Sequence, residues 1–566
     1  MVHHEKTDVP PLFREDCQPQ DPLLSIRGLA VKAGEKALVS HISLDIPRRT
    51  IMGLVGESGS GKTLTALSVL GLLPRGVEIT SGSIMLNGTP AATELLHLPV
   101  KQLNRIRGNR ISMIFQEPMT SLNPTMKCGP QAIEPLLKEG GRSKNEAKEE
   151  ILQLFREVKL PDEHHIYNAW PHELSGGQRQ RVMIAMALST NPDLLIADEP
   201  TTALDVTVQK NILDLLLGLK EKYDLSILFI THDLMVLKQI ADEIAVMYRG
   251  EIVETGSMEQ ILEHPSTPYA KGLLACRPHL DQQPERLPTV ADFMNPDRSV
   301  PPPRKDHSHK SPPEVLLSVQ DLEVRFQGRG RSVTAVNAVS FDVFKGETLG
   351  LVGESGCGKT TLGRTILQLI NANSGSVIFE GKSLNRMHSG QLRRTRRRIQ
   401  IVFQDPYSSL NPGKTIGNIL TEPMVVHQLA SGKADREARA RKLLNQVDLP
   451  ADAYNLYPHQ FSGGQRQRIG IARALACAPD FIILDESVSA LDVSVQAQIL
   501  NLLNDLKAEY DLTYVFISHD LTVVKYMSDR VLVMSEGRIV ESGTAEKIYL
   551  DPSENYTRKL ISSIPG

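Results

Sequence analysis

The chain has 566 residues, of which 41% are hydrophobic and 23% charged, so it is an ordinary globular protein. This length exceeds what a single hydrophobic core supports and predicts about two to four domains. Lys and Arg number 63 against 66 Asp and Glu, and a net charge of -3 gives no electrostatic reason to expect nucleic acid as the main partner.

The first 22 residues are polar and contain no apolar run, which excludes a secretory signal peptide within them. No segment of the chain approaches the roughly 20 consecutive apolar residues that a transmembrane helix needs. The five cysteines show no CxxC spacing and their number is odd, which argues against a disulfide framework. We therefore expect a cytosolic chain whose membrane work is done through partner chains. The cysteines are Cys17, Cys128, Cys276, Cys357 and Cys477.

Short apolar runs alternate with helical patterns from residue 23 onward. Four of them predict strands, IMGLVG, RISMIF, LLIAD and SILFIT, each followed by a turn signal or a helix. Buried strands that alternate with helices indicate an α/β fold with a mostly parallel sheet. Residues 131–167 are helical in pattern and rich in charge, and predict a helical subdomain inserted into this fold.

The segment GESGSGKT follows the first of these strands and opens a helix, the context that a phosphate-binding P-loop requires. Glycines let the backbone N–H groups curl around phosphates at the helix N-terminus. Lys62 is expected to reach the β- and γ-phosphates, and Thr63 to ligate Mg²⁺. The predicted loop consists of Gly56, Glu57, Ser58, Gly59, Ser60, Gly61, Lys62 and Thr63.

Two adjacent acids suit different tasks: Asp198 ends the run LLIAD, and Glu199 follows it. Asp198 stands where P-loop proteins hold Mg²⁺ at the end of a buried strand. Glu199 is a candidate to orient the attacking water or to accept its proton. His232 follows the run SILFIT; a lone histidine is more often structural than catalytic, and this residue by itself leaves both interpretations open.

Residues 277–313 are rich in proline, charge and histidine, and include PPPRKDHSHKSPP. This composition favours an extended linker over a folded segment. A metal site at His307 and His309 is the alternative. The predicted organisation is a polar tail (1–22), a first domain (23–276), the linker (277–313) and a second domain (314–566).

The second domain repeats the first. The SGGQ, DE and HD segments recur at one constant offset, because 462−175, 486−199 and 519−232 all give 287. Only two copies occur, which indicates duplication of a whole domain. The second copy supplies a second metal-binding acid, Asp485, a second candidate base, Glu486, and a second histidine, His519. Its predicted P-loop consists of Gly353, Glu354, Ser355, Gly356, Cys357, Gly358, Lys359 and Thr360.

The segments LSGGQ and FSGGQ, together with the glutamine segments, the acid pairs, ALD and the histidines, all in order, resemble the ABC ATPase family. The resemblance covers about residues 23–275 and 315–560. It implies two P-loop cassettes, each with a RecA-like core, an antiparallel β subdomain and an inserted helical subdomain. It also implies that the duplicated cassettes form a pseudo-dimer within one chain, and that ATP and Mg²⁺ are the cofactors.

The same resemblance assigns the site residues. Each ATP lies between one P-loop and the other cassette's signature, so Lys62 pairs with Ser462 and Lys359 with Ser175. Glu199, Glu486, His232 and His519 become catalytic, and Asp205 and Asp492 lie in loops that link the two sites. The implied signature residues are Ser175, Gly176, Gly177, Gln178, Ser462, Gly463, Gly464 and Gln465. The implied Mg²⁺ ligands are Thr63, Gln116, Asp198, Thr360, Gln404 and Asp485; Gln116 and Gln404 also contact ATP.

Three positions depart from a symmetric pattern. Ser487 replaces the proline that Pro200 keeps after the acid pair, and Phe461 replaces the usual signature leucine. The aromatic residue expected to stack on adenine is Phe326 in the second copy, whereas the first copy has Ala33. Base–aromatic stacking contributes about 1–3 kcal/mol, so we expect the first P-loop to bind nucleotide more weakly.

The segments QEPMTSLNP, QDPYSSLNP and HPSTPYAKGLLA resemble the oligopeptide/dipeptide/nickel importer branch, and the fused arrangement is similar to its glutathione and microcin C or oligopeptide ATPases. This resemblance implies two separate permease subunits, an extracytoplasmic binding protein, a peripheral position on the cytoplasmic face of the bacterial inner membrane and a peptide-like cargo. With only Cys276 near the relevant region, no iron–sulfur cluster is expected.

The alternative is a soluble ATPase with two cassettes that acts on ribosomes or DNA. The ribosome-bound class needs a long helical linker, and the prolines of residues 277–313 disfavour a helix there. The DNA-repair class needs CxxC pairs, which the sequence lacks. The basic run from Arg393 to Arg398 precedes the second glutamine segment, and a solvated or phosphate-facing helix end explains it better than nucleic-acid binding.

Overall fold

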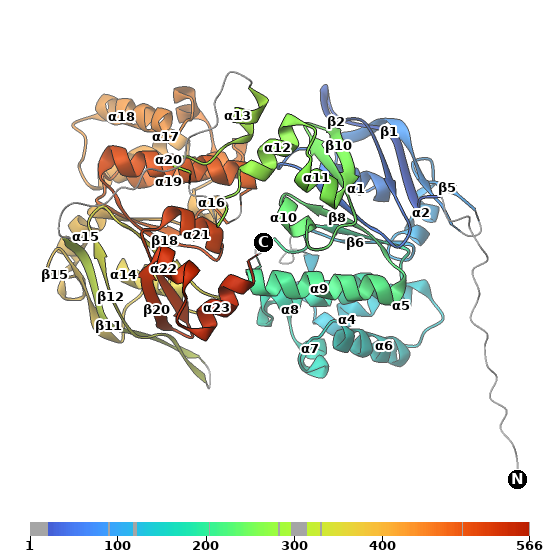
Figure 1. Cartoon of the computed structure of the whole chain (residues 1–566), viewed down its shortest axis with the longest axis horizontal. Helices are drawn as coiled ribbons and strands as arrows, with labels where there is room; N and C mark the ends of the chain where they lie inside the picture. Colours follow the sequence, from blue (N-terminus) through green and yellow to red (C-terminus); the bar gives the residue numbers. More distant parts are fainter. Residues whose placement is uncertain are drawn as a thin grey trace, which may run out of the picture. The chain divides into compact units, whose positions relative to one another are not determined.

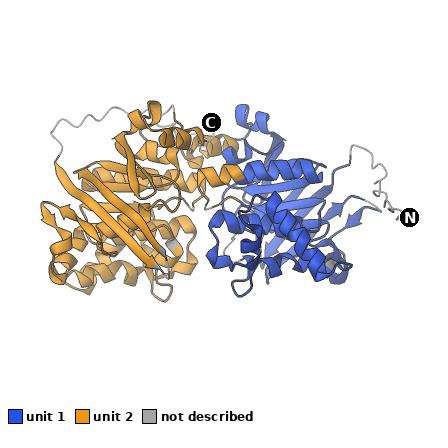
Figure 2. Ribbon diagram, turned by 90° about the horizontal axis from the view of Figure 1, so that it is seen from below, with its two compact units in different colours: residues 1–200, 212–267 blue, residues 201–211, 268–566 orange. Residues whose placement is uncertain are grey.

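The computed structural model describes residues 21–88, 91–116, 121–202, 204–280, 284–295, 314–328, 331–489 and 491–564. The chain divides into two compact units. Unit 1 comprises Met1–Pro200 and Ile212–Thr267, and unit 2 comprises Thr201–Asn211 and Pro268–Gly566 (Figures 1 and 2). The predicted tail lies almost wholly outside the described residues, as do most of the predicted linker and both His307 and His309.

Each unit contains one six-stranded sheet whose central strands are parallel and fully apolar. In unit 1 the strand order is β10-β9-β3-β8-β7-β6, and only β10 runs antiparallel to its neighbour. Every residue of β3, β7 and β8 is buried, which explains why these strands read as continuous apolar runs rather than alternating ones. The strands are β3 Ile51–Val55, β6 Ile111–Ile114, β7 Leu194–Asp198, β8 Ser226–Thr231, β9 Glu243–Tyr248 and β10 Glu251–Ser257.

Unit 2 repeats this sheet in the order β16-β17-β18-β13-β19-β20. The four strands predicted in the first cassette are confirmed as β3, β6, β7 and β8, and the predicted α/β class is confirmed in both units. The strands of unit 2 are β13 Thr348–Val352, β16 Ile399–Val402, β17 Phe481–Asp485, β18 Thr513–Ile517, β19 Arg530–Ser535 and β20 Arg538–Thr544.

A four-stranded antiparallel sheet packs on each parallel sheet. One apolar core joins the two sheets in each unit, with residues such as Ile26 and Ile196 in unit 1 and Val319 and Ile483 in unit 2. The antiparallel strands are β1 Leu24–Ala33, β2 Lys36–Ile46, β4 Val77–Leu86 and β5 Thr93–Glu94 in unit 1, and β11 Val315–Gly328, β12 Arg331–Phe344, β14 Ser374–Phe379 and β15 Lys382–Ser383 in unit 2.

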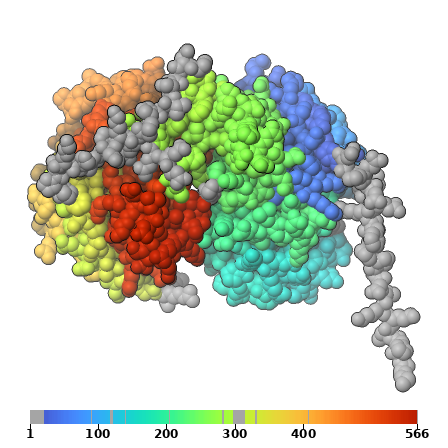
Figure 3. Space-filling view, in the orientation of Figure 1, coloured from blue at the N-terminus to red at the C-terminus, as the bar shows by residue number. Residues whose placement is uncertain are grey.

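Helices fill the stretch predicted as an inserted subdomain. Its longest helix in unit 1, α6, begins at a capping box in which Ser143 accepts from the Glu146 N–H and Glu146 accepts from the Ser143 N–H. The cyan surface of this subdomain lies away from the blue surface of the antiparallel sheet, with green surface between them (Figure 3). Its helices are α4 Cys128–Ala132, α5 Glu134–Glu139, α6 Lys144–Glu157 and α7 Glu163–Asn168, with α17 Ile416–Val426 and α18 Lys433–Gln446 in unit 2.

The helices outside this subdomain frame the sheets. Unit 1 contains α1 Lys62–Leu70, α2 Val100–Ile106, α8 Gly176–Leu188, α10 Leu234–Leu237 and α11 Met258–Glu263, and shares α9 Val206–Tyr223 with unit 2. Unit 2 contains α12 Pro268–Ala275, α13 Val290–Met294, α14 Lys359–Ile366, α15 Ser389–Arg398, α16 Pro406–Ser409, α19 Gly463–Leu475, α20 Val493–Tyr510, α21 Leu521–Met527, α22 Ala545–Leu550 and α23 Asn555–Ser562. In the described residues, no helix is both long and apolar enough to span a bilayer.

The segment that follows the first cassette packs on α20 of unit 2. The Asn501 side-chain amide donates to the Leu287 carbonyl at 2.9 Å and accepts from the Leu287 N–H at 2.9 Å. An ion pair of 2.8 Å joins Arg286 to Asp505 on the same helix. Because Asn501 is buried, this two-way amide pairing satisfies polar groups that burial would otherwise leave without partners.

Candidate functional site

The loop between β3 and α1 has the backbone geometry that a phosphate cradle requires. Gly59 has a φ of 79° and Gly61 a φ of 106°, in the left-handed region that favours glycine. A Cβ at Gly56 would lie 2.1 Å from the Met247 carbonyl oxygen, so a side chain there would displace the loop. A glycine-rich turn at the start of a helix offers backbone N–H groups to an anion, so the start of α1 suits a phosphate.

Lys62, the first residue of α1, is 5% exposed and closes the loop. Its Nζ donates to the carbonyl oxygens of Gly56 at 2.6 Å and Glu57 at 2.9 Å. An ammonium held this way keeps one positive charge inside the loop. The remaining predicted residues of the loop, Ser58 and Ser60, lie along the same turn.

The loop between β13 and α14 reproduces this geometry in unit 2. Gly356 and Gly358 have φ values of 79° and 109°. Lys359 Nζ donates to the carbonyl oxygens of Gly353 at 2.7 Å and Glu354 at 2.9 Å. Ser355 completes the turn, and Cys357 takes the place of the serine of the first copy, with its thiol 3.9 Å from the lysine ammonium.

The two predicted metal-binding acids lie at the ends of β7 and β17, beside the hydroxyl groups of the loops. Thr63 hydrogen-bonds to Asp198, and Thr360 Oγ1 donates to Asp485 Oδ1 at 3.0 Å. Burial raises the pKa of Asp198 to about 6; the Thr63 hydrogen bond and the Lys62 charge oppose the rise, and the Glu199 charge adds to it. Burial likewise raises the pKa of Asp485.

One oxygen of this buried carboxyl group fits a metal ligand. Asp198 is 1% exposed, and its Oδ1 has no hydrogen-bond partner in the part of the chain that the structure describes. Buried carboxylates are paired or bind metals. With a hydroxyl and a carboxylate as the donors, both oxygen ligands, the pair suits a hard cation such as Mg²⁺.

The two candidate bases share an unusual backbone conformation. Glu199 and Glu486 both have a φ of 46°, a region that non-glycine residues rarely occupy. Each N–H donates at 2.9 Å to the neighbouring strand, to Ile230 in unit 1 and Ile517 in unit 2. Strain of about 1–3 kcal/mol at such residues clusters at functional sites.

Each candidate base contacts the predicted histidine of its own cassette. His232 Nδ1 lies 3.3 Å from Glu199 Oε2, and His519 Nδ1 lies 3.5 Å from Glu486 Oε2. In unit 2 the predicted glutamine joins them, because Gln404 Nε2 donates to Glu486 Oε2 at 2.7 Å. Gln116, its counterpart, is exposed and borders residues 117–120, which lie outside the described part.

Electrostatics in unit 2 favour an ionised pair. Burial acts to raise the pKa of Glu486, but the His519 hydrogen bond and the charges of His519 and Lys359 outweigh it, and the pKa is lowered. Burial acts to lower the pKa of His519, but the Glu486 hydrogen bond and the charges of Glu486, Asp520 and Asp205 raise it. Asp492, the second predicted linking acid, precedes α20 in the same unit.

The two signatures form matching helix starts. Ser175 caps α8 and Ser462 caps α19, each with a reciprocal capping box to a glutamine three residues later, Gln178 or Gln465. The glycines between them, Gly176, Gly177, Gly463 and Gly464, begin the helices and leave their N–H groups unobstructed by long side chains. Ser175 lies in unit 1 and Ser462 in unit 2; their pairing with opposite P-loops stays a prediction.

The register of the antiparallel sheets places Ala33 and Phe326 at equivalent positions. Ala33 pairs with Lys36, and Phe326 with Val333. Two residues beyond each partner, a carbonyl oxygen lies against the last glycine of the P-loop: Leu38 against Gly61, and Ala335 against Gly358. Phe326 is 46% exposed, so its ring is free to stack on a ligand.

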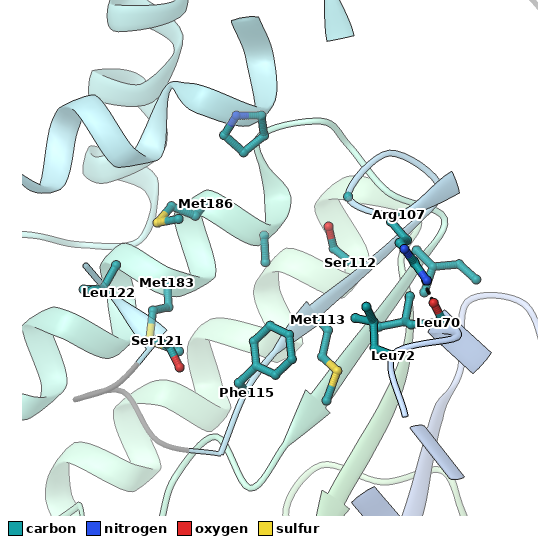
Figure 4. Close-up of a pocket in the computed structure, with 14 residues that line it drawn as sticks. Leu70, Leu72, Arg107, Ser112, Met113, Phe115, Ser121, Leu122, Met183 and Met186 are labelled. Carbon is teal, nitrogen blue, oxygen red and sulfur yellow. Dashed lines mark hydrogen bonds between the residues drawn. The ribbon is translucent and has the colours of Figure 1, made fainter. Parts of the chain in front are cut away.

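A cavity of about 270 Å³ opens in unit 1 where the helical subdomain meets the parallel sheet. In Figure 4, Leu122, Met183 and Met186 line one side, Leu70, Leu72 and Arg107 the other, and Phe115 lies between them. Arg107 is the one charged residue of the lining; it donates to the Leu70 carbonyl at 2.7 Å. Phe115, which lines this cavity, directly precedes Gln116 of the predicted site.

Sequence reasoning missed this cavity and the strained acids. The cavity combines residues 70 to 187, which no local pattern connects. The left-handed φ of Glu199 and Glu486 had no local signal either, because neither residue is Gly, Asn or Asp.

Two family models match the chain. A model described as ABC transporter matches residues 39–202 and 336–489, and one described as oligopeptide/dipeptide transporter, C-terminal region, matches residues 253–302 and 540–566.

Two curated proteins are similar over nearly the whole chain. The glutathione import ATP-binding protein GsiA of Escherichia coli (strain K12) is 45% identical over 543 residues, which cover 94% of this chain and 86% of that protein. The protein of the same name from Salmonella typhimurium (strain LT2) is 44% identical over 561 residues, covering 96% and 89%. Among solved structures, a post-hydrolysis dimer of the ATP-binding cassette MJ0796 with ADP and Pi aligns with 41% of this chain and 99% of that chain, at 28% identity and a TM-score of 0.38.

Proposed function

The chain belongs to the ABC transporter family of ATPases and hydrolyses ATP, and from this premise we propose that it energises the import of peptide-like solutes through separate permease subunits. The observation that carries the importer assignment is the match of both cassettes to the C-terminal region of oligopeptide/dipeptide transporters. Glutathione is itself a small peptide, and the relatives are named for its import. These matches favour an importer over the ribosome-associated alternative.

At each site, bound Mg²⁺ would neutralise the phosphate charge that develops as the γ-phosphate leaves. Thr63 with Asp198, and Thr360 with Asp485, are the residues that would hold it. Their hydroxyl and carboxyl groups already contact each other in each unit. Lys62 and Lys359 hold the β- and γ-phosphates by charge.

Glu199 and Glu486 orient the attacking water and accept its proton. His232 and His519 hold these carboxylates from the side, through the contacts of 3.3 and 3.5 Å. Gln404 donates to the same carboxylate oxygen of Glu486, and so couples the base to the segment that follows β16. Ser175 and Ser462, with the glycines that follow them, supply N–H donors to the γ-phosphate of the opposite cassette.

The cavity beside Gln116 is the place where a permease subunit would act on the first cassette. Its lining is mostly apolar, with Arg107 as its one charged residue, and it opens at the boundary of two subdomains. Its wall includes Phe115, adjacent to the glutamine. A permease segment seated there shifts with the helical subdomain. On this account the chain is peripheral to the cytoplasmic face of the membrane, and an extracytoplasmic binding protein selects the cargo.

The direct test is to isolate the chain from its source membranes in mild detergent and identify what accompanies it. We expect two integral-membrane permease subunits in stoichiometric amounts. Ribosomal proteins or nucleic acid in their place would reject the importer assignment and support the alternative.

A further inference from the structure

The two cassettes differ at the position of the cavity in unit 1. Helices α8 and α19 have equal length and an offset of 287, so Met183 corresponds to Gly470 and Met186 to Arg473. In the first cassette two flexible thioether side chains line the cavity. In the second cassette, Gly470 has no side chain and Arg473 has a guanidinium group.

Arg473 forms a hydrogen bond in the second cassette at the place that corresponds to the cavity of the first. Its guanidinium donates to the Ser409 carbonyl, just before the loop enters the helical subdomain. Ser409 corresponds to Ser121, which lines the cavity of unit 1. The Met186 side chain has no N–H group and cannot make this contact. An arginine stays charged at any physiological pH, so the second cassette places a cation at this junction.

Two further arginines of α15 add to this charge. Arg393 Nη2 donates to the Val426 carbonyl at 3.2 Å, and Arg397 Nε donates to the Cys477 carbonyl at 3.3 Å. Both bonds are to neutral carbonyl groups, and among the described residues neither arginine forms an ion pair. The charge of Glu422 acts on Arg473. Burial and the charges of these two arginines lower the pKa of His427, which lies beside Val426.

The corresponding turn of unit 1 contains Arg107 but has no counterpart of Arg397. Arg107 and Arg396 are equivalent, since each donates to the carbonyl at the end of the P-loop helix, Leu70 or Leu367. After Arg107 come Gly108 and Asn109, where unit 2 has Arg397. Gly108 lines the cavity.

The size of the cavity in unit 1 suits one large apolar side chain. A cavity of about 150 Å³ already accommodates benzene, whereas sites for drug-sized ligands measure about 300–1,000 Å³. At about 270 Å³ the cavity lies between these values. Methionine side chains adapt to varied apolar partners.

We propose that the two cassettes dock chemically different permease segments: the first takes a segment that inserts an apolar side chain beside Met183 and Met186, and the second takes a segment that presents a carboxylate to Arg393, Arg397 and Arg473. The inference rests on the proposed function. It means that the two permease subunits are not interchangeable and that each binds one cassette.

The test uses photo-crosslinking from two equivalent exposed leucines. Leu72 is 41% and Leu369 52% exposed, and the two are equivalent because 72−62 and 369−359 both give 10, counted from the P-loop lysine of each cassette. The full chain carrying benzoylphenylalanine at one of these positions is expressed in its source cells, irradiated in membranes, and its adducts identified by mass spectrometry. We expect two different permease subunits, with an acidic residue in the segment captured at position 369.

Capture of one and the same subunit equally at both positions would overturn the inference while leaving the proposed function intact. Capture of no membrane protein at either position, by a chain that still hydrolyses ATP, would reject the proposed function itself.

A charge reversal tests the chemistry. Arg393→Glu is expected to reduce capture at position 369 about fivefold or more, because a like charge then faces the docked carboxylate, and to leave capture at position 72 unchanged. Arg394→Glu, an exposed neighbour on the same helix, is the matched control. Equal losses for both variants, or no loss for Arg393→Glu, would count against a carboxylate. In the first cassette, Met186→Arg should reduce capture at position 72 and Met186→Leu should retain it.

Discussion

Glu486 Oε2 accepts a hydrogen bond from Gln404 Nε2 at 2.7 Å and lies 3.5 Å from His519 Nδ1. In the first cassette, Glu199 and His232 form the same contact at 3.3 Å. Both acids occupy the same strained backbone conformation. Two candidate bases held in the same orientation are what the proposed hydrolysis in both cassettes requires.

Replacing both candidate bases should separate binding from hydrolysis. Glu199→Gln with Glu486→Gln keeps the size and hydrogen bonds of the side chains but removes the proton acceptor. General acid–base catalysis contributes about 10²–10⁴-fold, so we expect phosphate release to fall by at least about 100-fold while a fluorescent ATP analogue still binds. Glu221→Gln, on a residue whose side chain is 80% exposed, is the control. Near-normal turnover in the double variant would refute the assigned roles.

The buried Asp198 should make the nucleotide-free chain less stable as pH rises. Its folded pKa of about 6 exceeds the ordinary 3.8, so the folded chain binds the proton first and loses stability as pH rises through about 6. The difference corresponds to about 3 kcal/mol. In EDTA, Asp198→Asn should raise the unfolding temperature by several degrees at pH 7.5 and by roughly half as much at pH 5.

The exposed Asp224 supplies the control for that experiment, since Asp224→Asn removes a carboxylate whose side chain is 66% exposed. A shift for Asp198→Asn that is the same at both pH values would show that the carboxyl group does not titrate as stated.

The difference between Ala33 and Phe326 should appear as unequal nucleotide affinity. With Lys62→Ala present to silence the first loop, Phe326→Ala should weaken ATP binding at the second by about 1–3 kcal/mol, or roughly 5- to 150-fold. Conversely, Ala33→Phe should strengthen the first site in a Lys359→Ala background. Gln327→Ala, on the opposite face of the same strand, should leave affinity unchanged. Equal affinities at the two unmodified loops would contradict the asymmetry.

The pairing of each signature with the opposite P-loop is testable by combining variants. If Lys62 and Ser462 serve one site, the double variant Lys62→Ala with Ser462→Arg should have about the same ATPase rate as the slower of the two single variants. Either change alone already inactivates that site, so the second change removes nothing more. Lys62→Ala with Ser175→Arg should instead combine two losses. Steady-state ATPase rates of the three single and two double variants decide between the pairings, and the reverse pattern would assign each signature to its own cassette.

Local patterns predicted the parts of the fold that are continuous in sequence. The central strands β3, β7 and β8 were predictable because burial on both faces makes them apolar throughout. The hairpin of β9 and β10 was not singled out, although its two-residue turn at Arg249 and Gly250, both with positive φ, is a recognisable signal.

Contacts between distant residues were beyond local patterns. Leu287 pairs with Asn501, 214 residues away, and nothing near either residue indicates the other. The loops and acids of the candidate site were predictable because each follows a strand, and parallel strands bring their carboxyl ends to one edge. The contact of Gln404 with Glu486 and the difference between Met186 and Arg473 required the folded chain.

The most direct measurement is solute uptake by cells of the source organism that lack this gene and carry it on a plasmid. Labelled glutathione and a labelled dipeptide are supplied separately, and expression of each variant is verified. We expect the unmodified chain to restore uptake of at least one of them and Glu199→Gln with Glu486→Gln to restore none. Two results would contradict the importer assignment: uptake with the double variant that equals uptake with the unmodified chain, or uptake of both solutes that is the same with and without the gene.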